Sequence, residues 1–137
     1  MTLVDTGPLV AVCDPRDSRH RTALKHLYRL APAGLAACDA VLVETCFHLP
    51  YRSQRERVRA VLDDLGFEAL STGDPDFWRD VLAWLLRYAE HEPDWADGCI
   101  AVLCGRDEQL RVWTYDREFR TTWRKPNGRV IPLALVP

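Results

Sequence analysis

Three carboxylates in this chain are each the only charged residue within a run of apolar or small neighbours. They are Asp5 in residues 1–13, Glu44 in residues 40–51 and Asp97 in residues 95–105. Such runs are typical of a protein core, where an ionised carboxylate costs several kcal/mol unless positive charge or hydrogen bonds meet it. A bound divalent cation would give all three acids one common reason for their placement.

Asp116 is a fourth candidate, because it directly follows the apolar stretch of residues 112–115, although Arg117 stands beside it. Carboxylate oxygens are hard ligands that suit Mg²⁺ or Mn²⁺, and such ions activate water for attack on phosphorus. Thr6 and Thr114 are candidates for orienting the carboxylates or metal-bound water. The four acids and two threonines therefore predict a metal-dependent hydrolytic site.

Structural roles would explain some of these acids separately. Asp5 and Asp116 could each be only the N-cap of a helix, a position that Asp favours. Capping does not explain Glu44, because it lies in the middle of an expected helix. A structural salt bridge could account for Glu44 or for Asp97 separately. Asp94 is the better candidate for a pure cap, three residues ahead of Asp97.

The elements that must position these residues alternate between short apolar runs and amphipathic segments. Strands are expected at residues 2–4, 35–38, 67–70, 110–114 and 130–135. Helices are expected from residue 7 and at residues 18–30, 39–48, 53–65, 75–90, 94–105 and 117–123. This alternation predicts an α/β fold with a largely parallel sheet, whose ligand site lies beyond the carboxyl ends of the strands.

Length and composition favour one soluble domain over residues 1–137. The 47% hydrophobic and 28% charged residues are unlike those of a disordered chain, and no apolar run is long enough to cross a bilayer. The first residues lack a signal-peptide pattern, so we expect a cytoplasmic protein. Five cysteines without a CxxC pair, and four histidines without an HExxH pattern, argue against a disulfide framework and a zinc site.

The net charge of −2 does not predict nucleic-acid binding, but the basic residues are clustered in residues 16–21, 52–59 and 117–129. The third cluster follows Asp116 directly, and contact with a phosphate requires such proximity. Its candidate substrate-binding residues are Arg117, Arg120, Arg124 and Lys125. Each cluster could instead be ordinary solvated surface.

The order of these acids along nearly the whole chain resembles that of the PIN-domain nucleases, most closely the VapC-type toxins of toxin–antitoxin pairs. The matching segments are Asp5-Thr6 after the first strand, Glu44 mid-helix, the helix start at residues 97–101, and residues 114–119. The resemblance implies a three-layer α/β/α fold with a central, largely parallel sheet of four to five strands. One departure is Gly98, where the family often has alanine, which leaves open whether Asp94 or Asp97 takes the third acidic position.

The resemblance also implies a function. Asp5, Glu44, Asp97 and Asp116 would bind Mg²⁺ or Mn²⁺, as one or two ions, and cleave RNA as the endoribonuclease toxin of a type II, VapBC-like system. A cognate antitoxin and a homodimer are implied as partners, and no membrane. Two alternatives remain: a non-toxin PIN-type nuclease for RNA processing or DNA, and a non-catalytic binding module of the same fold.

The expected helix at residues 75–90 is apolar on more than one side. Trp78, Leu82 and Leu86 form a surplus apolar face. This face could contact a partner, or it could be buried within the monomer.

Overall fold

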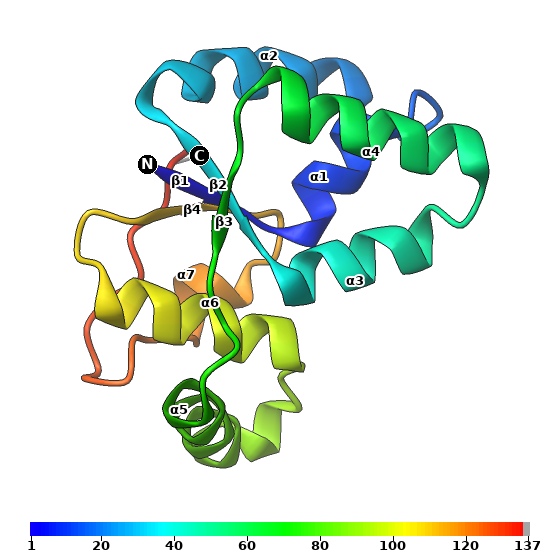
Figure 1. The fold of residues 1–137 in the computed structure, drawn as a ribbon. Helices are drawn as coiled ribbons and strands as arrows, with labels where there is room; N and C mark the ends of the chain where they lie inside the picture. Colours follow the sequence, from blue (N-terminus) through cyan, green and yellow to red (C-terminus); the bar gives the residue numbers. More distant parts are fainter. Residues whose placement is uncertain (136–137) are drawn as a thin grey trace.

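Four short strands form one parallel sheet in the computed structural model, which describes residues 1–135 (Figure 1). Their bounds are Thr2–Val4 for β1, Leu35–Cys38 for β2, Glu68–Leu70 for β3 and Arg111–Trp113 for β4. The strands lie in the order β3-β2-β1-β4, and each neighbouring pair is parallel. The strand order reverses between β1 and β4, which is where open parallel sheets form their ligand crevices.

Helices cover both faces of the sheet, and this confirms the predicted three-layer α/β/α fold (Figure 1). α1, α2 and α4 lie on one side, and α5, α6 and α7 lie on the other, while α3 packs against α1 and α6. The bounds are Thr6–Cys13 for α1, His20–Leu30 for α2, Asp39–His48 for α3, Arg52–Asp64 for α4, Pro75–Arg87 for α5, Trp95–Arg106 for α6 and Glu118–Thr121 for α7. Single 3₁₀ turns occupy Ala31–Ala33 and Ala89–His91.

The fifth strand expected at residues 130–135 does not form within the described residues. Leu133 makes one isolated parallel bridge to Val112, and Val130 makes an antiparallel bridge to Arg124 instead. Pro132 lies between them and has no N–H to donate to a strand ladder, so regular pairing cannot run through it. The segment therefore covers the edge of β4 without extending the sheet.

The helix boundaries follow local capping chemistry. The Asp74 side chain accepts a hydrogen bond from the Phe77 amide, and Pro75 occupies the first helical position of α5. Asp39 fits the pattern of an N-cap for α3, but the N-cap is Cys38, and Asp39 is the first helical residue. This shift does not move Glu44 from the middle of α3.

The core is centred on β1, β2 and α6. Every residue of both strands is buried, and α6 is buried from Gly98 to Cys104, because the sheet covers one side of it and α5 the other. α5 packs so closely on α6 that a Cβ at Gly98 would lie 2.8 Å from Val81 Cγ1. The neighbouring helix therefore leaves no room for a side chain at position 98.

The apolar face of α5 points to solvent. Leu86 is 77% exposed, Leu82 51% and Trp78 48%, so the alternative that the monomer buries this face is wrong. No helix among residues 1–135 combines the length and hydrophobicity required to cross a membrane.

Candidate active site

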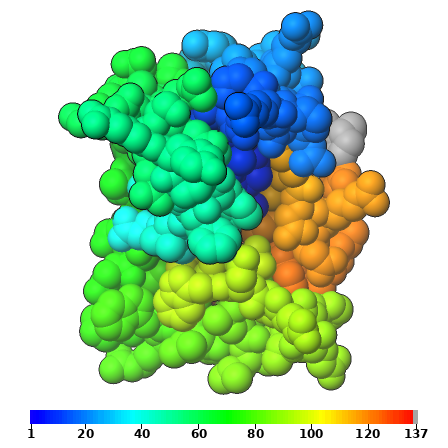
Figure 2. All heavy atoms as spheres, turned by 90° about the vertical axis from the view of Figure 1, so that its right-hand side faces the viewer, coloured from blue at the N-terminus to red at the C-terminus, as the bar shows by residue number. Residues whose placement is uncertain are grey.

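Four separate elements bring acidic side chains to the carboxyl edge of the sheet. Asp5 follows β1, Asp116 follows β4, Glu44 projects from α3, and Asp97 lies in the first turn of α6. Figure 2 faces this edge, where the dark blue start of α1, teal α3, the orange segment after β4 and the yellow-green start of α6 meet. Segments that are far apart in sequence therefore share one surface.

Asp5 is anchored by two hydrogen bonds. Its Oδ1 accepts from the Thr6 amide at 2.8 Å, which caps α1, and its Oδ2 accepts from Thr114 Oγ1 at 2.7 Å. Thr114 Oγ1 also accepts from the Asp116 amide at 3.0 Å, and Asp116 Oδ1 accepts from the Glu118 amide at 2.9 Å. Capping is thus part of the role of Asp5, but the bond to Thr114 additionally ties it to the segment after β4.

Glu44 is linked to the same region through the other predicted threonine. Thr6 Oγ1 donates to Glu44 Oε2 at 2.9 Å. Thr6 is the first residue of α1, so this bond joins α3 to the end of β1. Both threonines that the sequence singled out therefore donate hydrogen bonds to the candidate acids.

Asp94 and Asp97 form a reciprocal cap at the start of α6. The Asp97 amide donates to Asp94 Oδ1 at 2.8 Å, and the Asp94 amide donates to Asp97 Oδ2 at 3.1 Å. The sequence indicates a pure cap at Asp94, yet its charge also acts on Asp5, Glu44 and Asp97. Only the pairing of Asp94 with Asp97 has a sequence signal, because acids at N-cap and N3 positions face each other across one helical turn.

No basic side chain among residues 1–135 forms an ion pair with any of these acids. The ion pairs of the described chain involve other carboxylates, on Glu56, Asp63, Asp74, Asp76 and Asp80. A structural salt bridge therefore does not explain Glu44 or Asp97. Within residues 1–135, the hydrogen bonds to Asp5, Glu44, Asp97 and Asp116 come from neutral hydroxyl and amide groups.

The pKa values of three of the acids are raised, chiefly by burial. Burial raises the pKa of Asp97 from 3.8 to about 8, and the charges of Asp94, Asp5 and Asp116 add to this. Burial, followed by the charges of Asp94 and Asp5, raises the pKa of Glu44 from 4.5 to about 7 against the bond from Thr6. The pKa of Asp5, which is 9% exposed, is also raised, mainly by burial. Mutual repulsion of this kind is relieved by protons or by a cation.

The chemical type of the donors fits a hard divalent cation. Every candidate ligand is a carboxylate, and neutral hydroxyls orient two of them, which suits Mg²⁺ or Mn²⁺ rather than zinc. Among residues 1–135, however, no three His, Cys, Asp or Glu side chains stand where one metal ion could join them. An ion would require carboxylates to rotate toward it, and the exposure of Asp116 permits such movement. Metal binding by Asp5, Glu44, Asp97 and Asp116 stays a prediction.

The four basic candidates after β4 differ in accessibility. Arg117 and Arg120 are exposed and line a cavity together with Thr114 and Asp116. Arg124 is half-buried, and its guanidinium donates to the Trp123 carbonyl at 2.8 Å. Lys125 is only 7% exposed, so its predicted contact with RNA does not fit its position. The reason is that the chain turns inward at Trp123, which is itself buried.

Comparisons with known proteins agree with this architecture. A family model described as PIN domain matches residues 2–124. The chain resembles the crystal structure of Mycobacterium tuberculosis VapC20, described there as a Sarcin-Ricin loop cleaving toxin, with a TM-score of 0.71 and 22% sequence identity. The match covers 88% of this chain and 94% of that chain. No curated protein sequence gives a significant match. At this identity, the likeness to the solved structure shows the fold alone.

Proposed function

The chain belongs to the PIN-domain family, and from this membership we propose that it is a Mg²⁺- or Mn²⁺-dependent endoribonuclease. The observation that carries the proposal is the group of acids at the carboxyl edge of the sheet, which have raised pKa values and no basic partner within residues 1–135. Keeping such acids together without a counter-charge lowers stability. Folds retain that arrangement most often where it has a functional role.

Asp5, Glu44, Asp97 and Asp116 are the residues that would hold the cation, with Asp94 as an alternative third acid. A bound divalent cation would supply Lewis-acid activation of water and charge stabilisation at the scissile phosphate. Thr114 fixes the rotamer of Asp5, and Thr6 fixes that of Glu44, through the hydrogen bonds described above. Because no single ion could join three acids of residues 1–135 as they stand, binding would require the other carboxylates to turn toward these two.

RNA would reach this acidic edge past basic side chains. Arg117 and Arg120 are exposed beside Asp116, and neither forms an ion pair within residues 1–135. Their guanidinium groups are free to bind phosphate oxygens in a bidentate manner. We assign the substrate rim to these two arginines rather than to Lys125.

The likeness to a VapC toxin, together with the apolar surfaces of the chain, supports a toxin in a type II, VapBC-like system. A cavity of about 330 Å³ beside Glu44 is lined in part by Val43, Trp78 and Trp95, and it suits an apolar side chain of a cognate antitoxin. The exposed Leu82 and Leu86 suit a homodimer contact. A single domain over residues 1–137 and a cytoplasmic location belong to the same proposal.

RNA cleavage by the purified chain tests the proposal. Cleavage should require Mg²⁺ or Mn²⁺, stop in EDTA, and fall about 100-fold or more in Asp5→Asn and Asp97→Asn. Asp76→Asn is the matched control, because Asp76 is an exposed acid paired with Arg79 away from the site. Full cleavage in both site variants would contradict the proposal. Cleavage without growth arrest on expression would instead favour a non-toxin PIN nuclease.

A further inference from the structure

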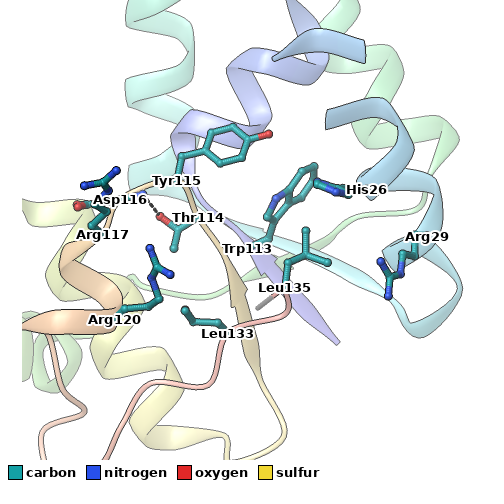
Figure 3. Close-up of a pocket in the computed structure, with 10 residues that line it drawn as sticks. All are labelled: His26, Arg29, Trp113, Thr114, Tyr115, Asp116, Arg117, Arg120, Leu133 and Leu135. Carbon is teal, nitrogen blue, oxygen red and sulfur yellow. Dashed lines mark hydrogen bonds between the residues drawn. The ribbon is translucent and has the colours of Figure 1, made fainter. Parts of the chain in front are cut away.

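A cavity of about 420 Å³ opens at the outer edge of β4, beside the acidic site but separate from its carboxylates, apart from Asp116 (Figure 3). α2 supplies His26 and Arg29, and the segment from Trp113 to Arg117 forms another wall. Figure 3 shows Arg29 and Arg120 on opposite sides of the Leu135 side chain. The volume is in the range of small-ligand sites and suits a nucleotide-sized molecule.

The cavity is rich in available positive charge. Arg29, Arg117 and Arg120 line it, and within residues 1–135 none of their guanidinium groups makes an ion pair or a side-chain hydrogen bond. Among residues 1–135, the single carboxylate in the lining is Asp116. An arginine guanidinium presents a planar fork that matches phosphate oxygens. The net charge of the cavity therefore favours an anion.

Unpartnered polar atoms concentrate at the same place. In the described chain, buried side-chain atoms without a hydrogen-bond partner occur on four residues, and three of them, His26, Trp113 and Tyr115, line this cavity. The Trp113 side chain is 1% exposed, and its Nε1 can only donate. A buried polar group left unpaired costs about 1–3 kcal/mol, so this cluster calls for a ligand that bonds to it.

The two features together describe a ligand with an anionic part and a flat polar part. Arginines would bind phosphate, and the Nδ1 of His26, the Nε1 of Trp113 and the hydroxyl of Tyr115 would bond to a base or ribose once these side chains turn toward the cavity, because all three atoms are buried. The three aromatic rings stand edge to face, with centroids 6.1 Å apart for His26–Trp113 and 6.3 Å for Trp113–Tyr115.

The cavity also adjoins the reacting region. Thr114 lines it and donates to Asp5 Oδ2, and Asp116 belongs to both sites. We propose that this cavity is a nucleotide subsite that holds one residue of single-stranded RNA next to the scissile phosphate, with Arg29 as a binding residue. The subsite itself rests on the cavity, while its role in RNA cleavage rests on the proposed function.

Calorimetric titration of the full chain in EDTA tests the subsite independently of cleavage. The probes are the four nucleoside 5′-monophosphates and inorganic phosphate. At least one nucleotide should bind about tenfold or more tightly than phosphate, because the base adds hydrogen bonds that phosphate lacks. Binding no tighter than that of phosphate would overturn the proposal.

Two variants locate the binding. Arg29→Ala should weaken nucleotide binding about tenfold or more, whereas Arg21→Ala, an exposed arginine on the same helix outside the cavity, should not change it. Tyr115→Phe removes an unpaired hydroxyl, so it should weaken binding without lowering the melting temperature. Equal effects of Arg29→Ala and Arg21→Ala would overturn the assignment.

Competition identifies the source of the nucleotide. A short single-stranded oligoribonucleotide should displace the bound monophosphate, and failure to displace it would contradict an RNA subsite. If binding is absent while Mg²⁺-dependent cleavage persists, the subsite is wrong and the nuclease stands. If binding persists while cleavage is absent under all metal conditions, the cavity is a nucleotide site but the proposed role beside the scissile phosphate falls with the nuclease.

Discussion

At the scale of single residues, the unusual property of this chain is a group of acids that lie close together without an ion pair to any basic side chain among residues 1–135. Asp97 and Glu44 bind protons more tightly in the folded state because burial and neighbouring acids raise their pKa values. Hydroxyl groups rather than basic side chains provide the contacts to Asp5 and Glu44. The stability of the apo protein should therefore depend on pH in a way that a cation can reverse.

The sign of that dependence follows from the direction of the pKa shifts. The pKa rises on folding from 4.5 to about 7 for Glu44 and from 3.8 to about 8 for Asp97, so the folded state holds more protons in this window. The contribution of these two groups to the free energy of unfolding should be most favourable below about pH 4, where both are protonated in either state. As the pH rises to 8 this contribution is lost, and the melting temperature in EDTA should fall with it. Thermal denaturation from pH 5 to 8 measures it, and Mg²⁺ at pH 8 should restore the loss. An Asp97→Asn variant whose profile is as steep as wild type would contradict this assignment.

Thr114 offers a second residue-scale prediction. Thr114→Val keeps the shape of the side chain but removes the hydroxyl that donates to Asp5 Oδ2, so RNA cleavage should fall about 10- to 100-fold. Thr114→Ser keeps the hydroxyl and should recover most of kcat/KM. A serine variant as slow as the valine variant would show that side-chain packing, and not the hydrogen bond, sets the activity.

At the scale of elements, α5 and α6 are coupled by a close approach at Gly98. A Cβ there would lie 2.8 Å from Val81 Cγ1 and 3.4 Å from Leu85 Cδ2. Gly98→Ala gains about 1 kcal/mol of helix propensity but overpacks a tight core, which costs about 1–3 kcal/mol. We expect a net loss of unfolding free energy in denaturant titrations.

A double-mutant cycle separates overpacking from other effects of the substitution. Val81→Ala removes the methyl groups that crowd position 98. The double variant Gly98→Ala/Val81→Ala should therefore lose less unfolding free energy than the sum of the two single losses. Gly73→Ala is the control, because no atom lies within 4 Å of the position that a Cβ would occupy there. Additive losses in the cycle would rule out the crowding explanation.

Sequence patterns predict best those elements whose signal is unambiguous. The apolar runs at residues 2–4 and 35–38 are fully buried strands, as alternation of apolar strands with helices predicts. The segment at residues 130–135 has similar composition, but Pro132 interrupts its pairing and only isolated bridges form. Strand propensity is a local property, whereas pairing depends on a partner and on a free N–H at each position.

The candidate site is also predictable only in part, because some of its features are local in sequence and others depend on the fold. An acid isolated among apolar neighbours is visible in the sequence, and this signal singles out Asp5, Glu44 and Asp97, which lie at one edge of the sheet. The sequence does not reveal the burial of Lys125 or the influence of Asp94 on Glu44, because both depend on how the chain turns after β4 and before α6. The cavity near Trp113 leaves no sequence signal, since unpaired indole and phenol groups become visible only when their neighbours are placed.

At the scale of the whole molecule, the exposed apolar face of α5 predicts self-association. Leu82 and Leu86 lie one helical turn apart and are 51% and 77% exposed. Leu82→Glu/Leu86→Glu should shift the mass from dimer to monomer in light scattering after gel filtration, with little change in melting temperature. Ala83→Glu, an exposed position next to this face, is the control. An unchanged mass in the double variant would contradict self-association through this face.

Carboxylates that follow β1 and β4, together with those of α3 and α6, should jointly bind a divalent cation. Calorimetric titration of the full chain with Mn²⁺ at pH 8 tests it most directly. Wild type should bind Mn²⁺ saturably and release protons, because acids with raised pKa values must ionise to become ligands. Asp5→Asn/Asp97→Asn should lose this binding, whereas Asp76→Asn should keep it. Equal Mn²⁺ binding by wild type and the double variant would contradict the account.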